Sequence, residues 1–249
     1  MSSVSKSLQI LKYMGEPPYE MGVTEIADKI GMVKSGVHKL LSDMAEAGFV
    51  VKNEKTRLYR LGPTVFRLGV VYSDAKGIAE VAGNVLQAIV AATHASSLVG
   101  LLEGDEAFLA YKLDAPGTFI YRGRVGRTFP LYAGALGKIF GAYMERERVI
   151  ASLKRTGFTR KTELTVRDTE TLFRQYEEIR RNGYALSLGE NIDGAFGLSV
   201  PIFDVRTQSV TADLCLAGPV ELYEPEKLDE WLRILREGAS EIAYKMARR

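Results

Sequence analysis

The sequence has few of the residues on which several protein classes depend. It contains one cysteine, Cys215, and two histidines in 249 residues, which excludes an internal disulfide and leaves little material for a metal site. No apolar run approaches the roughly 20 residues that a membrane-spanning helix needs. The opening segment MSSVSKSLQI lacks the apolar stretch of a secretion signal. We therefore expect a cytoplasmic protein with no metal or other cofactor.

The composition is that of a globular chain of about two domains. Hydrophobic residues make up 46% and charged residues 26% of the sequence, which excludes the disordered and fibrous classes. The formal net charge is +2, and residues 1–62 carry all of this excess, with nine Lys and Arg against seven Asp and Glu. So small an excess is compatible with a polyanionic partner but does not require one.

Hydrophobic periodicity predicts two short helices at the start of the chain. Val4, Leu8 and Leu11 have the spacing of one inward face, and the helix should end near Gly15. Thr24 is placed as the N-cap of the second helix. That helix should bury three residues and stop at a glycine, and these are Ile26, Ala27, Ile30 and Gly31.

A third helix follows after the short link GMVK, and its N-terminal end is polar. Its inward residues recur at i, i+3, i+4 and i+7 and are Val37, Leu40, Leu41 and Met44. Gly48 is placed as its terminator. Two helices with this spacing are typical of a helix-turn-helix. The outward face comprises Lys34, Ser35, Gly36, His38, Lys39 and Ser42.

Two β-rich runs after Gly48 predict a two-stranded wing. The runs FVV and TRLYRLG are separated by the polar turn KNEK. The basic residues of this predicted wing are Lys52, Lys55, Arg57 and Arg60, and Glu54 is the acidic residue among them. A helix fits the major groove, and the positive end of its dipole suits phosphate. We expect the third helix to face bases or phosphates, and the wing to contact phosphates or the minor groove. The alternative is a solvated face of an all-α core.

Three stretches of the chain resemble the IclR family of bacterial transcriptional regulators. SVSKSLQILKYM with VTEIADKIGMVKSGVHKLLSDMAEAGFVVK and YRLGPTVFRLG is similar to the family's winged helix-turn-helix and linker helix. FPLYAGALGKIFGAYM is similar to its effector-domain helix, and GYALSLGENIDGAFGLSVPIFD with TADLCLAGP to its C-terminal signature. Two positions depart from the family pattern, because Gly36 and Gly134 stand where the family usually carries hydroxyl residues.

The resemblance implies a regulator with a GAF-like effector domain. Such a protein binds palindromic double-stranded operator DNA as a homodimer or a dimer of dimers, and a small organic acid modulates that binding. A helix N-terminus near Ala133 would offer backbone N–H groups to a carboxylate. The pocket residues that the resemblance implies are Gly134, Ala135, Ala195, Gly197, Ser199, Cys215 and Ala217.

The remaining sequence predicts an α+β domain with an antiparallel sheet. A helical pattern runs from Pro63 to Ala92 with a break at Gly77, which gives a DNA-binding domain over 1–62, a linker helix over 63–76 and an effector and oligomerisation domain over 77–249. Strand-like runs flank a Gly104-Asp105 turn. Helices follow over ALGKIFGAYM and 168–181, then the strands YALSL, GLSVPIFD and SVTADLCLAG, and a last helix after Pro225.

No catalytic motif is complete. GALGK lacks the glycine spacing and the Ser or Thr of a phosphate-binding loop, and no G-x-S-x-G elbow occurs. His94 is interpreted as a helix C-terminal residue and Cys215 as a small buried side chain rather than a nucleophile. Three arginines, Arg122, Arg124 and Arg127, lie close enough for an anion clamp, but such residues are usually solvated. The chain is predicted not to be an enzyme; the alternatives are an enzyme on a GAF-like scaffold, or an architectural or protein-interaction module that needs no ligand.

Overall fold

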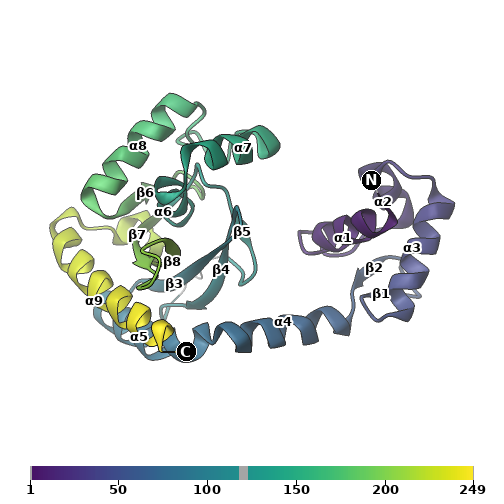
Figure 1. Cartoon of the computed structure of the whole chain (residues 1–249), viewed down its shortest axis with the longest axis horizontal. Helices are drawn as coiled ribbons and strands as arrows, with labels where there is room; N and C mark the ends of the chain where they lie inside the picture. Colours follow the sequence, from purple (N-terminus) through teal and green to yellow (C-terminus); the bar gives the residue numbers. More distant parts are fainter. Residues whose placement is uncertain (1, 118–122, 249) are drawn as a thin grey trace. The chain divides into compact units, whose positions relative to one another are not determined.

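A computed structural model describes residues 2–117 and 123–248 (Figure 1). The chain divides into two compact units, Met1–Lys76 and Gly77–Arg249, and each is described by itself. The first unit contains the helices α1 (Ser3–Met14), α2 (Val23–Ile30), α3 (Lys34–Glu46) and α4 (Pro63–Lys76), with the strands β1 (Val50–Lys52) and β2 (Tyr59–Leu61).

The prediction for the inward face of α1 is wrong. Val4 and Leu8 are 70% and 57% exposed, whereas Ile10 and Met14 are buried in the core of the unit. The stripe Val4–Leu8–Leu11 and the stripe Ile10–Met14 overlap near Leu11, which is partly buried. Periodicity alone therefore does not choose between them, and two apolar residues of α1 remain on the surface.

The interior of the helix-turn-helix agrees with the predicted pattern, but one cap does not. Gly22, not Thr24, is the N-cap of α2, because the carbonyl of Gly22 accepts the first helical bond from Ile26 N–H at 3.0 Å. Gly31 ends α2 in the left-handed conformation, at φ 60°. The predicted inward residues are buried, namely Ile26, Ala27 and Ile30 on α2 and Val37, Leu40, Leu41 and Met44 on α3.

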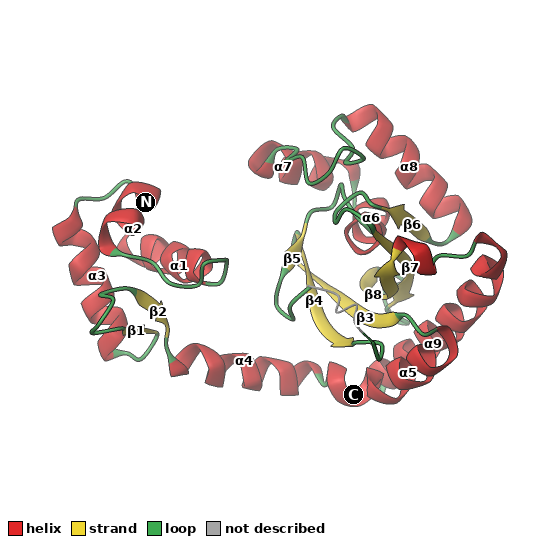
Figure 2. Cartoon of the chain, turned by 180° about the vertical axis from the view of Figure 1, so that it is seen from behind, coloured by secondary structure: helices red, strands yellow, loops and turns green. Residues whose placement is uncertain are grey.

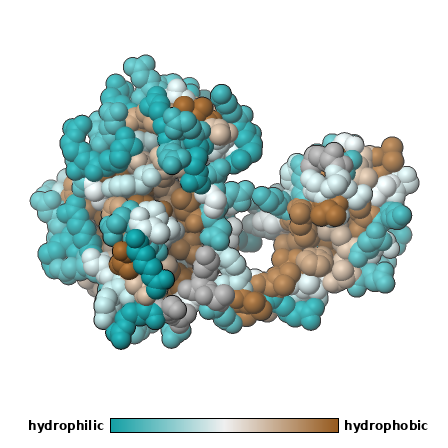
Figure 3. All heavy atoms as spheres, viewed as in Figure 1, coloured by the Kyte–Doolittle hydropathy of each residue, from teal (hydrophilic) through white to brown (hydrophobic). Residues whose placement is uncertain are grey.

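The wing and α4 complete the first unit. β1 and β2 pair antiparallel, from Val50 opposite Leu61 to Lys52 opposite Tyr59, which confirms the predicted wing. α4 begins where Thr64 Oγ1 donates to the carbonyl of Ala47 at 3.1 Å. Five apolar or aromatic residues of α4 are exposed by 41% to 74%, and Figure 3 shows hydrophobic surface along this helix. They are Phe66, Leu68, Val70, Val71 and Tyr72.

The second unit is built on one antiparallel sheet of six strands in the order β5-β4-β3-β8-β7-β6. The strands are β3 (Ser96–Glu103), β4 (Glu106–Leu113), β5 (Thr128–Phe129), β6 (Ala185–Leu188), β7 (Ala195–Phe203) and β8 (Val210–Pro219). The Gly104-Asp105 hairpin joins β3 and β4 as predicted. The α+β class with an antiparallel sheet is confirmed.

Helices cover both faces of this sheet (Figure 2). On one face lie α5 (Ile78–Thr93), which begins after the left-handed Gly77, and α9 (Leu228–Ala247), which follows two 3-10 turns at Val220–Leu222 and Pro225–Lys227. On the other lie α6 (Ala135–Tyr143), α7 (Arg146–Thr156) and α8 (Thr169–Asn182). Neither α7 nor β5 was predicted. Along β8 the side chains alternate, so that Leu214 and Leu216 face α5 and α9 while Cys215 and Ala217 face α6.

Candidate DNA-binding surface and effector pocket

The outward face of α3 is exposed and basic. Lys34, Ser35, His38, Lys39 and Ser42 are all exposed, whereas Gly36 is half-buried. Within the described part of the chain no acidic group pairs with the two lysines. The acids of this helix, Asp43 and Glu46, lie in its C-terminal half. The first turn of α3 therefore presents positive charge to solvent.

No side chain caps the start of α3. Its N-cap is Val33, whose side chain has no hydrogen-bond acceptor. The Gly36 N–H donates to the Val33 carbonyl at 3.0 Å, whereas the N–H groups of Lys34 and Ser35 keep their donor capacity, and no side chain neutralises the positive end of the helix dipole. These are the features that favour an anion such as a backbone phosphate.

The wing adds four cations to this unit. Lys55, Arg57 and Arg60 are exposed and Lys52 is half-buried. Arg57 lies at the tip in the left-handed conformation, at φ 61°, where its N–H donates to the carbonyl of Asn53 at 2.7 Å. Its guanidinium contacts Glu54 at 3.2 Å, but both side chains are at least 70% exposed. So exposed a pair is weak, and phosphate can displace Glu54.

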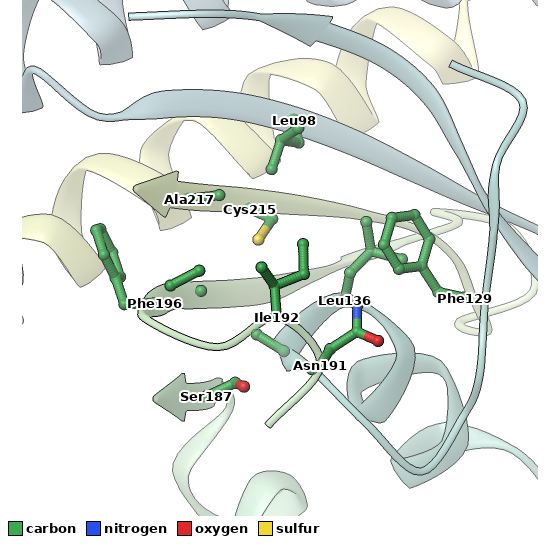
Figure 4. A pocket seen from close by; sticks show the side chains of 13 residues that line it. Leu98, Phe129, Leu136, Ser187, Asn191, Ile192, Phe196, Cys215 and Ala217 are labelled. Carbon is green, nitrogen blue, oxygen red and sulfur yellow. The ribbon is translucent and has the colours of Figure 1, made fainter. Parts of the chain in front are cut away.

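The second unit contains a small pocket beside the N-terminus of α6 (Figure 4). Its volume is about 40 Å³. Leu98, Cys215 and Ile192 are directed toward the same space, from β3, β8 and the loop between β6 and β7. The full lining is Leu98, Phe129, Gly134, Ala135, Leu136, Ser187, Asn191, Ile192, Ala195, Phe196, Gly197, Cys215 and Ala217.

The structure brings six of the seven predicted pocket residues together, and Ser199 is the exception. The six are Gly134, Ala135, Ala195, Gly197, Cys215 and Ala217. Ser199 is fully buried, and its hydroxyl donates to the Asp213 carboxylate. This hydrogen bond holds the Ser199 side chain away from the pocket lining. Arg122 lies outside the described residues, and neither Arg124 nor Arg127 lines the pocket.

The pocket lining is mostly apolar and carries no charged side chain among the described residues. Its polar side chains are Ser187 and Asn191. The start of α6 forms one wall of the pocket, and there the Lys138 N–H donates to the Gly134 carbonyl at 3.1 Å as the first bond of the helix. The N–H groups of Ala135 and Leu136 precede that bond and have no acceptor in the described chain. The α6 wall can therefore donate hydrogen bonds to a negatively charged group.

The start of α6 requires glycine at position 134. Gly134 has φ 79°, a conformation that L residues rarely adopt. A Cβ atom there would lie 3.1 Å from Cβ of Asn191. Without a side chain at 134, the loop that carries Asn191 packs directly against the helix start.

A buried ion pair, which the sequence reasoning missed, fixes the same two elements together. Lys138 is 3% exposed, and its ammonium contacts the Glu190 carboxylate. The other oxygen of Glu190 accepts the N–H of Gly134 at 3.3 Å. Burial lowers the pKa of Lys138, an effect that Glu190 opposes. Lys138 and Glu190 lie 52 residues apart, so no local pattern signals the contact.

A second buried carboxylate lies on the α6 side of the sheet. Asp213 accepts the N–H of Gly100 at 2.8 Å and the hydroxyl of Ser199. Burial raises the pKa of Asp213 to about 7. Burial also raises the pKa of the Cys215 thiol, which agrees with the interpretation of Cys215 as an unreactive side chain. The one available signal for Asp213 was an acid inside the apolar run TADLCLAGP.

Residues 2–117 and 123–248 contain no group of three or more His, Cys, Asp or Glu side chains placed to hold a metal ion. In the same ranges, no helix combines the length and apolar character needed to cross a bilayer.

Comparisons with known proteins cover nearly the whole chain. The family model "IclR helix-turn-helix domain" matches residues 3–54, and "Bacterial transcriptional regulator IclR C-terminal" matches residues 70–244. The HTH-type transcriptional regulator KdgR of Escherichia coli (strain K12) is 30% identical over 246 residues, which are 99% of this chain and 93% of KdgR.

Solved structures agree with the described fold. A structure described as an IclR transcriptional regulator from a Silicibacter species is 27% identical with a TM-score of 0.89, covering 99% of this chain and 96% of that one. An IclR homologue from Microbacterium hydrocarbonoxydans in complex with 4-hydroxybenzoate is 22% identical with a TM-score of 0.80, covering 99% of both chains. At that identity the second likeness bears on the fold alone.

Proposed function

The chain belongs to the IclR family of bacterial transcriptional regulators, and from this membership we propose that it is a one-component regulator whose operator affinity responds to a small organic acid. That the chain is a DNA-binding regulator follows from the family. Its members carry a helix-turn-helix for DNA and a C-terminal domain for a ligand, and are regulators rather than enzymes. The proposal adds the contacting residues, the ligand class and the assembly.

The observation that carries the DNA part is the exposed, basic first turn of α3. Ser35, His38 and Lys39 are exposed on α3 and would face base edges or phosphates once α3 enters a major groove, into which a helix fits. Lys55, Arg57 and Arg60 of the wing would then neutralise phosphates or enter the minor groove. Since duplex DNA is confined to the cytoplasm of a bacterium, we place the protein there.

Two features of the pocket support an acid as effector. The N–H groups of Ala135 and Leu136 offer hydrogen bonds to a carboxylate, and Asn191 adds an amide on the facing loop. Leu98, Cys215 and Ala217 form an apolar floor that suits the hydrocarbon part of a ligand. The 4-hydroxybenzoate complex of the Microbacterium relative makes an aromatic acid one candidate.

The pocket must widen to accept such a molecule. Its volume of about 40 Å³ holds only a few water molecules, since one water needs roughly 10–15 Å³ by this kind of measure. The loop with Asn191 and Ile192 closes one side of the pocket, and it is held to α6 by Glu190. An acid that binds a wider state better shifts the protein toward that state. Linkage then requires DNA to change the affinity for the acid by the same factor by which the acid changes the affinity for DNA.

The exposed apolar residues of the first unit support a homodimer, or a dimer of dimers. Val4 and Leu8 on α1 and Phe66 and Val71 on α4 are 57% to 74% exposed, with no cover in their own unit. Exposed apolar side chains on two helices of one unit are a feature of surfaces that another protein copy covers. Two copies related by a two-fold axis would match a palindromic operator.

A DNA-binding titration tests the proposal. Full-length protein is titrated onto labelled DNA from upstream of its own gene and onto random DNA of equal length, with and without a panel of small acids that includes 4-hydroxybenzoate. We expect specific binding that one acid strengthens or abolishes. Binding that no acid alters would remove the effector and leave an architectural DNA-binding protein. Equal affinity for both duplexes would overturn the regulator itself, and turnover of an acid would favour an enzyme.

A further inference from the structure

The first turn of α3 carries an exposed apolar side chain among its cations. Val33 is 72% exposed. It occupies the N-cap, where Ser, Thr, Asp or Asn is strongly preferred because its oxygen caps the helix. A single exposed valine is ordinary on most surfaces. At this position, however, it replaces a capping group and lies beside Lys34 and Ser35, the candidates for DNA contact.

The neighbouring Gly36 makes room for this apolar spot. A Cβ atom at position 36 would lie 2.8 Å from Cε of Met32 and 3.8 Å from Cγ2 of Val33. The missing side chain therefore lets Met32 and Val33 lie over the first turn. Met32 is partly buried and packs on the core of the unit, so Val33 is the one of the two that solvent reaches.

The edges of the bases in the major groove offer one apolar group, the 5-methyl of thymine. A valine that enters the groove at the start of a recognition helix finds its best partner there. The surrounding charge brings it to DNA, because Lys34 and Lys39 on the same helix have no acidic partner in the described ranges.

We propose that Val33 is a specificity-determining residue that reads a thymine methyl in each operator half-site. The apolar contact takes the place of the polar contact that a hydroxyl at position 36 would make. The inference rests on the proposed DNA-binding function and extends it, because it names the base and the chemical group that α3 recognises.

The test replaces thymine by deoxyuridine, which removes the methyl group and keeps every hydrogen-bonding atom. A binding site is first selected from random duplexes with the full-length protein. Each thymine of that site is then exchanged in turn, and the Kd is measured by fluorescence anisotropy. We expect one exchange per half-site to weaken binding about fourfold, the factor for one buried methyl-sized group.

Three variants assign the effect to Val33. Val33→Ala should bind the thymine and deoxyuridine sites equally. Val33→Thr keeps the branched shape and one of the two methyl groups, and serves if the alanine variant folds poorly; its discrimination should lie between those of the wild type and Val33→Ala. Val205→Ala, at an exposed valine in the second unit (49%), is the matched control and should keep the wild-type ratio.

The possible failures are distinguishable. If no sequence is selected, the regulator proposal itself fails. If wild-type protein selects a site but no exchange changes its Kd, or if Val33→Ala keeps the fourfold ratio, the reading of thymine by Val33 is overturned and DNA binding stands. Equal weakening on all duplexes by Val33→Ala would likewise overturn the inference, since it would indicate a structural effect.

Discussion

The candidate DNA contacts all lie between Val33 and Arg60, on one helix with its N-cap and one hairpin, whereas the pocket draws on residues from Leu98 to Ala217. The first surface consists of charged and hydroxyl side chains that face water. The second consists of main-chain N–H groups and small apolar side chains that the sheet brings together. Changes in the first unit should therefore act on single contacts, while changes around the pocket should act on the stability of the whole unit.

The largest expected effect comes from breaking the buried ion pair. Glu190→Ala leaves the Lys138 ammonium buried without its partner, and should lower the free energy of unfolding by about 3 to 5 kcal/mol. The single tryptophan, Trp231, lies in the core of the second unit, so its fluorescence during urea unfolding reports on that unit. Glu237→Ala removes an ion pair to Arg233 in which both side chains are over 60% exposed, and it should change little. Equal losses in the two variants would contradict the role of burial.

The next effect concerns Asp213 and pH. Its carboxyl has a pKa of about 7 in the folded protein against an ordinary 3.8, because burial penalises the charge. Because the folded pKa lies above the unfolded one, protonated Asp213 contributes to the free energy of unfolding. This contribution is complete below about pH 4 and is lost as the pH rises through about 7. The total loss is about 4 kcal/mol.

Asp213→Asn removes this titration. From pH 5 to pH 8 the free energy of unfolding of the wild type should therefore fall relative to that of this variant. Trp231 fluorescence during unfolding measures both free energies. A difference that stays constant over this range would show that Asp213 does not titrate there.

A smaller and more selective effect is expected at Gly134. Gly134→Ala forces an L residue to φ 79° and brings Cβ close to Asn191, at a cost of about 1 to 2 kcal/mol. The acid response should weaken at least tenfold, while DNA binding without acid stays unchanged. Gly157→Ala is the matched control, since Gly157 also has a positive φ, 68°, but an added Cβ meets nothing within 4 Å. Loss of the acid response in both variants would assign it to instability.

The smallest effects belong to the DNA surface, at about 1 kcal/mol for each contact. Arg57→Ala should weaken binding to all duplexes and reduce the slope of log Kd against log salt by about 1. His38→Ala should instead reduce the preference for the selected operator over random DNA. Anisotropy titrations at several salt concentrations separate the two. Equal loss on specific and random DNA for both variants would rule out this division between wing and helix.

The first unit was largely predictable because its signals are local. The interior of α3 follows from four apolar residues within eight positions, and the wing follows from a polar turn between two β-rich runs. The errors there are local ambiguities. At α1 two apolar stripes overlap. At α2 Gly22, four residues ahead of the buried Ile26, is the N-cap where Thr24 was expected.

The pocket was predictable only in part. Positions such as Gly134 and Ala217 were implied by resemblance to a family, and periodicity did not supply them. The prediction that Ser199 lines the pocket is wrong because its partner Asp213 lies on the neighbouring strand. The pairing of β7 with β8 sets that contact. Asn191 and the Lys138–Glu190 pair depend on how a loop packs against α6. Contacts of this kind arise from the tertiary structure.

The main-chain wall of the pocket has a consequence for inheritance. The N–H groups of Ala135 and Leu136 persist whatever side chains mutation places there, with proline the exception. The floor, by contrast, depends on the side chains of Leu98, Cys215 and Ala217, each of which a single codon change can enlarge, shrink or make polar. A lineage can therefore exchange the body of the molecule it senses while the anchoring end of the pocket stays chemically constant.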